Sequence, residues 1–277
     1  MTIEKIKNDV NKLVVNKLPI NELLFLTIGG SYSYGTNIDT SDIDIKGCMS
    51  NNTQYEIEYF DTYIYKLNYY IDMLIKNMPY EIELLGIREE NYIHLSDKGK
   101  ELINNSNLFL SQRCINSFCQ YSVDIFLKMI SISIINFKYI LDKNILNAFI
   151  KNTYHNNISF ANYDIDNFKI LLNSLVEFTD IILLKKHAMH TVRLYLMCID
   201  ILEKQKIITY RENDIDLLLN IRNGYFQKSD GTFNDDYFNI LYDLKSRIEY
   251  AINNTTLQLI PNENKINTFI NYLKEGK

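Results

Sequence analysis

The spacing of apolar residues along the chain changes once. Residues 2–17 have apolar positions at helical spacing, whereas residues 23–28 and 42–48 are short runs of strand length. The stretch 55–67 is rich in tyrosine and isoleucine and also favours strand structure. After residue 69 nearly all of the pattern is helical. The pattern therefore predicts an α/β part followed by a helical part.

The helical part is expected to contain several separate helices. They are predicted at residues 69–77, 111–141, 166–205, 213–222 and 235–252, and the Asn-rich segment 151–166 is predicted to be a loop. The expected fold class is α+β, with a small mixed β-sheet core and helices in residues 1–90. A mostly helical domain, residues 91–277, follows and is expected to complete the active site.

The composition favours a folded protein and argues against nucleic-acid-coating and membrane-spanning proteins. With 277 residues, of which 47% are hydrophobic, the chain can bury a sizeable core. Its formal net charge of -5 argues against a protein that coats nucleic acid through a broad basic surface. Charged residues interrupt the apolar positions of residues 1–20, and no run reaches the length of a membrane span. We therefore expect a cytoplasmic protein with no membrane partner.

The cysteines do not predict a metal site. The four are Cys48, Cys114, Cys119 and Cys198. They show neither Cys-x-x-Cys spacing nor histidines at zinc-finger spacing, so we expect them to be reduced and buried.

A glycine-rich turn is the first candidate for chemistry. Gly29 and Gly30 close the apolar run 23–28 and permit a tight or positive-φ backbone. Ser31 can then open a short helix whose free amides and hydroxyl point at an anion. Such a turn alone has a high false-positive rate, because most Gly-Gly pairs are only turns.

The Asp-x-Asp sequence that follows makes the turn more specific. Asp42 and Asp44 should lie on one face of the strand expected at 42–48, because strand side chains alternate. Two adjacent like charges are unfavourable without a cation between them, and Mg²⁺ or Mn²⁺ bound by carboxylates and substrate phosphates is the usual solution. The order strand, Gly-Ser turn, short helix, Asp-x-Asp strand therefore indicates a nucleotide site with a divalent metal.

At these residues the chain resembles the DNA polymerase β nucleotidyltransferase superfamily, whose signature is Gly-Ser followed by Asp-x-Asp. More specifically, it resembles the RNA-ligase-associated polymerase-β-like nucleotidyltransferases in Gly30–Thr36 and Ser41–Gly47. The similarity continues through Pro79–Leu85, Phe109–Ser111, Lys186–His190 with Arg193, and Ile221–Gly224. Tyr32 departs from the family, which often has arginine there, so one cationic phosphate contact would be missing.

The resemblance implies metal-dependent transfer of a nucleoside monophosphate from a nucleoside triphosphate, with ATP the expected donor. Asp42 and Asp44 would bind the metal, and Gly30, Ser31 and Tyr34 would contact the nucleotide. Attack on the α-phosphate would be in line and would need no covalent enzyme intermediate.

The third metal carboxylate has several candidates. Glu56, Glu58 and Asp61 all lie in the strand-like stretch, and strand parity alone does not choose among them. The family pattern favours Asp61.

A second constellation lies on the helix expected at 166–205. Lys186, His190 and Arg193 stand at i, i+4 and i+7 and so share one face of an otherwise apolar helix. A buried cation needs an anionic partner, which a bound triphosphate would supply. The alternative is a structural ion pair with Glu83 or Asp180.

The acceptor is the most open question. The resemblance implies an RNA end, such as that of a tRNA, in repair or tailing, with Arg113, Lys128, Lys138 and Arg222 as candidate backbone contacts. The alternatives are nucleotidylation of a protein or of a small molecule such as an aminoglycoside, and a regulator that binds nucleotide without catalysis. The regulator is the weaker alternative, because a binding module does not need paired metal carboxylates.

Overall fold

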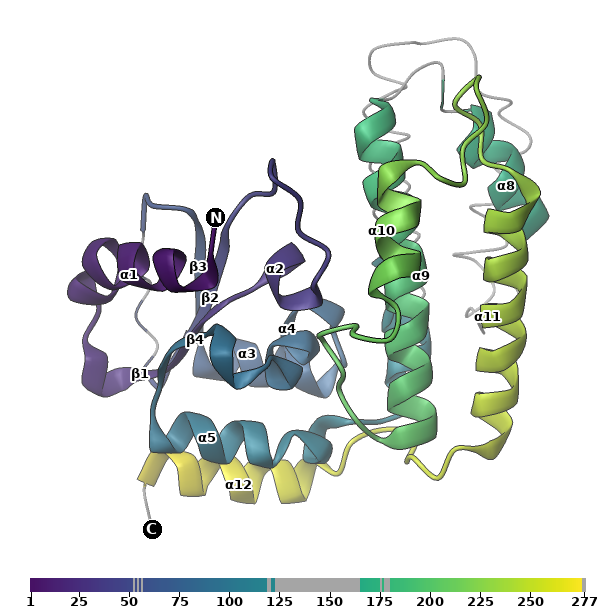
Figure 1. Cartoon of the computed structure of the whole chain (residues 1–277). Helices are drawn as coiled ribbons and strands as arrows, with labels where there is room; N and C mark the ends of the chain where they lie inside the picture. Colours follow the sequence, from purple (N-terminus) through teal and green to yellow (C-terminus); the bar gives the residue numbers. More distant parts are fainter. Residues whose placement is uncertain are drawn as a thin grey trace, which may run out of the picture. The chain divides into compact units, whose positions relative to one another are not determined.

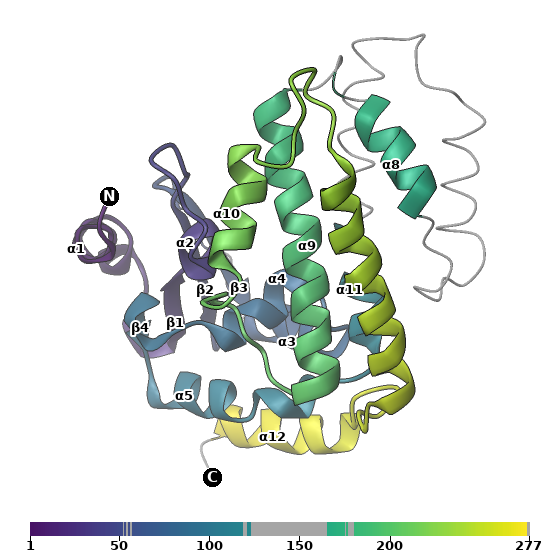
Figure 2. The ribbon, with the colours of Figure 1, turned by 45° about the vertical axis from the view of Figure 1, so that its right-hand side comes forward.

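The computed structural model describes residues 1–118 apart from 52, 54 and 56, and then residues 121–122, 165–174, 176 and 180–275. The chain forms two compact units (Figures 1 and 2). Unit 1 comprises Met1–Ser111, Gln205–Ile215 and Gln258–Lys277, and unit 2 comprises Gln112–Lys204 and Asp216–Leu257. Unit 1 thus extends beyond residue 90 and also takes in two later segments of the chain.

Unit 1 is built on a four-stranded mixed sheet in the order β3-β2-β1-β4 (Figure 1). The strands are β1 (Leu23–Ile28), β2 (Asp44–Met49), β3 (Asp61–Lys66) and β4 (Tyr92–Leu95). β1 is antiparallel to β2 and β4, whereas β2 and β3 are parallel. The α+β class and the mixed sheet are thus confirmed.

The strand boundaries differ from the expected ones. β2 begins two residues later than the run 42–48 suggested, and only the second half of 55–67 forms a strand. β4 was not predicted, because four residues are too few to show an alternating pattern.

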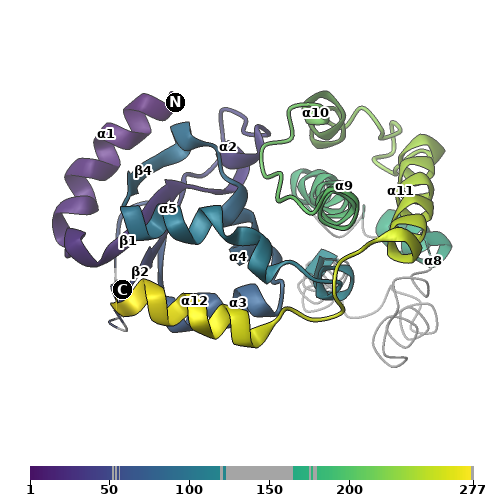
Figure 3. The same ribbon diagram turned by 90° about the horizontal axis from the view of Figure 1, so that it is seen from below.

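One face of the sheet packs against the first helix. α1 (Ile3–Leu13) begins after Thr2, whose hydroxyl accepts a hydrogen bond from the Lys5 amide. Ile6 and Val10 of α1 are fully buried in one cluster with apolar residues of β1 and β2. The amphipathic spacing that predicted this helix also sets the face that it buries. Figure 3 shows α1 on one side of the sheet.

The opposite face packs against α3 (Leu67–Ile75) and α4 (Pro79–Ile82). The Tyr70 ring of α3 meets the Phe25 ring of β1 edge-on, with centroids 5.6 Å apart. Its hydroxyl donates to the Glu81 carbonyl at 2.9 Å, which ties α3 to α4. The remaining helices of unit 1 are α2 (Gly30–Tyr34), α5 (Asp97–Asn104), α12 (Glu263–Glu275) and the 3-10 helices Val15–Lys17, Ile20–Glu22, Glu83–Gly86, Glu89–Asn91 and Ser106–Phe109.

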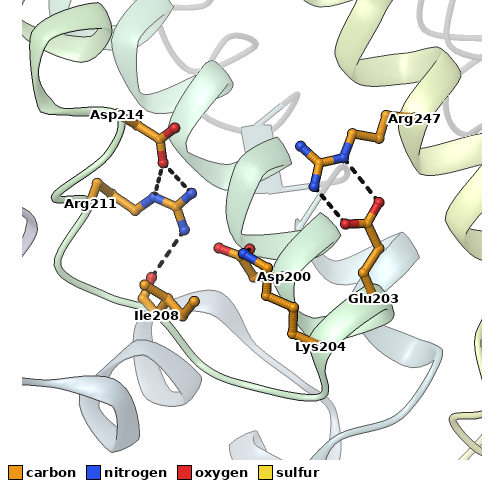
Figure 4. A network of polar contacts seen from close by, with 7 residues as sticks. All are labelled: Asp200, Glu203, Lys204, Ile208, Arg211, Asp214 and Arg247. Carbon is orange, nitrogen blue, oxygen red and sulfur yellow. Dashed lines mark hydrogen bonds and ion pairs between the residues drawn. The ribbon is translucent and has the colours of Figure 1, made fainter.

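The segment 205–215 belongs to unit 1 although it follows a helix of unit 2. The Thr209 hydroxyl donates to the Glu83 carbonyl at 2.5 Å, and the Arg211 amide donates to the Tyr34 carbonyl at 3.2 Å. The buried Arg211 guanidinium is itself held by the Asp214 carboxylate, to which its Nε donates at 2.9 Å (Figure 4). The segment therefore fixes the C-terminal end of α2.

Unit 2 contains α8 (Ile165–Ser174), α9 (Ile181–Lys204), α10 (Ile215–Asn223), which starts at the unit boundary, and α11 (Asp235–Asn254) (Figure 2). The prediction of one helix over 166–205 is wrong: α8 ends at Ser174, and the Asp180 side chain accepts from the Ile182 amide at 2.8 Å at the start of α9. Much of the helix expected at 111–141, and the loop expected at 151–166 up to residue 164, lie outside the described residues.

α9 and α11 lie side by side within unit 2 (Figures 1 and 2). The Tyr237 hydroxyl of α11 donates to the Ala188 carbonyl of α9 at 3.1 Å. Near the other end, Arg247 makes a two-pronged ion pair with Glu203, its Nε lying 3.0 Å from Oε1 (Figure 4).

Two expectations on composition can be checked in the described parts of the chain. Cys48, Cys114 and Cys198 are free and buried, as expected, and Cys119 lies outside the described residues. None of the described helices is both long enough and apolar enough to cross a membrane.

Candidate active site

The turn after β1 is packed directly against Asp44. The Gly29 amide donates to the Asp44 carbonyl at 2.9 Å. Gly30 has a φ of +56°, and a Cβ at that position would lie 1.9 Å from Asp44 Oδ2. Glycine is therefore favoured there, because any other residue would adopt a strained positive-φ backbone and would force the Asp44 carboxylate to move. The predicted short helix is confirmed: α2 begins at Gly30 and ends at Tyr34, and Gly35, whose φ is +78°, caps its C-terminus.

Two carboxylates meet across neighbouring strands. Asp44 and Asp61 are the first residues of the parallel strands β2 and β3 and are register partners. Lys46 Nζ lies 3.6 Å from Asp44 Oδ1 and 3.8 Å from Asp61 Oδ1. The Asp44 side chain is 27% exposed and that of Asp61 is 70% exposed. The start of the β2-β3 pair is thus an acidic site that is open to solvent and carries one built-in cation.

The electrostatics of this pair favour a bound cation. Burial raises the pKa of Asp44, and the nearby Asp61 carboxylate raises it further, while the Lys46 ammonium acts in the opposite direction. Lys46 thus offsets part of the repulsion between the two carboxylates. A cation of higher charge bound between them would offset more of it.

The other predicted carboxylates lie outside this pair. Asp42 precedes β2 and is exposed, Glu58 is exposed in the segment before β3, and Glu56 is not among the described residues. Within the described parts of the chain, no group of three or more His, Cys, Asp or Glu side chains is arranged to hold a metal ion. The structure therefore brings together two of the predicted acidic residues, Asp44 and Asp61.

A second carboxylate pair was missed as part of the site. Glu81 and Glu83 are both buried, and the Tyr34 hydroxyl of α2 donates to Glu83 Oε1 at 2.5 Å. Burial raises the pKa of Glu81 to about 7; a hydrogen bond from Tyr65 lowers it and the Glu83 charge raises it. Two glutamates two residues apart in the apolar run 79–85 were the sequence signal, since charged residues are rarely buried without a partner.

The predicted cationic residues gather in unit 2. On α9, Lys186 and His190 are half-buried, and Arg193 is only 2% exposed and donates from Nη1 to Met197 Sδ at 3.1 Å. Burial lowers the pKa of His190 well below its usual range, and the positive charges of Arg193, Lys186 and Arg222 lower it further. The cluster thus contains a neutral His190 among cations.

The remaining predicted nucleotide contacts lie on α2. Ser31 is half-buried, whereas Tyr32 and Tyr34 are buried. Tyr32 belongs to the core cluster that includes α1, so the side chain at this departure from the family pattern serves packing.

Comparison of the chain with protein-family models gives no match, and comparison with curated proteins gives none either.

Proposed function

We propose that the protein is a metal-dependent nucleotidyltransferase that moves a nucleoside monophosphate from a nucleoside triphosphate, with ATP the expected donor, to an acceptor hydroxyl. The observation that carries the proposal is the packing of Gly30 against the Asp44 carboxylate, with Asp61 directly opposite on β3. The Asp44 carboxylate lies so close to the Gly30 backbone that a side chain at this position would collide with it. An ordinary surface turn does not require such close packing of a carboxylate against its backbone.

The donor atoms suit magnesium or manganese. Mg²⁺ prefers oxygen ligands and is usually held by one or two carboxylates together with substrate phosphates. Asp44 and Asp61 would hold the ion, and Asp42 is the further predicted ligand. When bound, the metal lowers the pKa of the attacking hydroxyl and offsets charge at the α-phosphate.

The other predicted residues act on the nucleotide. Gly30, Ser31 and Tyr34 are the predicted nucleotide contacts, the first two at the β and γ phosphates. Lys186, His190 and Arg193 are predicted to bind the leaving pyrophosphate. Because His190 is neutral, the charge must come from Lys186 and Arg193, and His190 would supply a hydrogen bond.

The acceptor that we propose is an RNA end, such as that of a tRNA. The test is transfer of label from α-³²P nucleoside triphosphates to a panel of tRNA, total RNA, protein and aminoglycosides. An RNA acceptor held through several phosphates should also bind more weakly as salt rises, with a log-log slope of about -0.7 per neutralised phosphate.

Each outcome of this panel separates the alternatives. Label on RNA supports the proposal. Label only on a protein or a small molecule means that the reaction is nucleotidyl transfer but that the acceptor is not RNA. Nucleotide binding without transfer to any acceptor indicates the regulator instead.

A further inference from the structure

Three tyrosines form a continuous aromatic cluster beside the carboxylate pair. Tyr63 and Tyr65 lie on β3, and Tyr69 lies on α3. The Tyr63 and Tyr65 rings meet edge-on with centroids 4.6 Å apart, and the Tyr65 and Tyr69 rings are stacked at 6.2 Å with an interplanar angle of 13°. We call these three residues the tyrosine cluster.

One ring of the tyrosine cluster is buried and the other two are exposed. Tyr65 is buried against the Tyr70 ring and is hydrogen-bonded to the Glu81 carboxylate. By contrast, Tyr63 is 44% exposed and Tyr69 is 46% exposed. Two exposed rings that rest on an immobilised third ring form a contiguous aromatic surface on which a planar ligand can stack.

The position of the cluster relates it to the proposed chemistry. Asp61, Tyr63 and Tyr65 alternate along β3 and therefore share the face of the sheet that carries Asp44 and Lys46. The turn at Gly29 and Gly30 extends from β1, on the other side of β2 from β3. The carboxylate pair thus has the glycine turn on one side and the tyrosine cluster on the other.

In-line displacement assigns different reactants to these two sides. The attacking hydroxyl must approach the α-phosphate opposite the departing pyrophosphate. With the β and γ phosphates at the glycine turn, the acceptor approaches from the side of β3. The exposed rings of Tyr63 and Tyr69 therefore lie on the acceptor's side.

We infer that Tyr63 and Tyr69 stack unpaired bases at the end of the RNA acceptor. The inference rests on the proposed function, and it deepens that function by requiring a single-stranded end. Aromatic stacking accepts every base, because each base has a π-face, and it needs no broad basic surface. This matches a chain whose net charge is -5.

A single fluorophore tests the inference directly. The chain has no tryptophan, so Tyr63→Trp places the only indole on the cluster. Tyr250→Trp is the matched control, because Tyr250 is 68% exposed on α11 and is not in the cluster. The probes are single-stranded oligoadenylate, an abasic ribose-phosphate oligomer of equal length, and Mg-ATP.

The inference predicts saturable quenching of Tyr63→Trp by oligoadenylate, little by the abasic oligomer, and none of Tyr250→Trp. It is wrong if oligoadenylate does not quench, or if the abasic oligomer or the control gives equal quenching. It is also wrong if Mg-ATP quenches fully and prevents any further effect of oligoadenylate, since the ring would then hold the base of the donor nucleotide.

Alanine variants measure the strength of stacking. Tyr63→Ala and Tyr69→Ala should each raise the Kd for oligoadenylate by roughly 5- to 100-fold, whereas Tyr250→Ala should leave it unchanged. Unchanged affinity in both cluster variants would overturn the inference. Because binding is measured without turnover, failure of label transfer with intact stacking disproves only the proposed reaction.

Discussion

Unit 1 holds two pairs of carboxylates that differ in how their charge is offset. Asp44 and Asp61 lie at the open ends of β2 and β3, with the Lys46 ammonium within 4 Å of both. Glu81 and Glu83 lie in the interior beside the same sheet. The first pair shares the Lys46 ammonium, whereas the second accepts hydrogen bonds from tyrosine hydroxyls.

The buried pair is stabilised by hydroxyl groups and by a proton. Tyr34 donates to Glu83, Tyr65 donates to Glu81, and the raised pKa of Glu81 keeps it largely protonated below about pH 7. The difference teaches that carboxylate number alone does not define a metal site. The two pairs differ in exposure: the Asp44 and Asp61 side chains are partly open to solvent, whereas Glu81 and Glu83 are buried.

The largest expected effect is on activity at the open pair. Asp44→Asn and Asp61→Asn should each lower nucleotidyl transfer by about 10³-fold or more while the fold persists, because metal catalysis is worth several kcal/mol. Asp42→Asn is expected to do the same. The measurement is single-turnover transfer with saturating Mg-NTP.

Glu58→Gln is the matched control for Asp61, since Glu58 is an exposed carboxylate in the segment before β3. It should retain activity. If Glu58→Gln is inactive and Asp61→Asn is active, the third carboxylate has been misassigned.

The buried pair should instead govern stability. Because the pKa of Glu81 is raised from 4.5 to about 7, the folded state binds more protons than the unfolded state between these values. The contribution of Glu81 to the free energy of unfolding is therefore fully present below about pH 4.5 and is lost as the pH rises through 7. The loss is about 3 kcal/mol at most.

Glu81→Gln should remove this loss. Urea unfolding at pH 5 and pH 8 should give a smaller difference between the two pH values in Glu81→Gln than in the parent. Glu89→Gln, which changes an exposed carboxylate of the same unit, should leave the difference unchanged. Equal pH dependence in all three proteins would refute the assignment to Glu81.

The predicted phosphate-binding cations of α9 are the half-buried Lys186 and the buried Arg193. If Lys186 and Arg193 contact phosphates, Lys186→Met or Arg193→Met should weaken NTP binding by roughly 1 to 3 kcal/mol and change apo stability little or raise it. Melting curves with and without Mg-NTP measure both. Loss of apo stability with unchanged NTP affinity would support the structural ion pair.

The smallest effect is expected for the built-in cation. Lys46→Met removes the ammonium shared by Asp44 and Asp61, which are partly exposed, so apo stability should fall by no more than about 1 kcal/mol. Mn²⁺ should then bind more tightly, because the competing positive charge is gone. Weaker Mn²⁺ binding in calorimetry would show that Lys46 does not compete with the metal.

The sequence predicted much of the local structure around the site. The run 23–28, the glycines and the short α2 follow from strand length and turn chemistry, which are local properties. The pairing of Asp44 with Asp61 was foreseen only as one of several options, because a parallel register depends on the connection between the strands and not on side-chain alternation.

Other features needed the folded chain. The placement of 205–215 in unit 1 depends on contacts between segments more than a hundred residues apart. The burial of Glu83 depends on a hydroxyl group from another element, that of Tyr34. The break before α9 had a local signal that was overlooked, since Asp180 precedes an apolar run as a helix N-terminal residue often does.

The most direct test of the central claim compares ATP labelled at the α-phosphate with ATP labelled at the γ-phosphate, in the presence of Mg²⁺ and the acceptor panel. The account predicts acceptor-bound label from the α-phosphate only, release of the γ label as pyrophosphate, and loss of transfer in Asp44→Asn but not in Glu89→Gln. Acceptor-bound label from the γ-phosphate, or undiminished α-label transfer in Asp44→Asn, would contradict it.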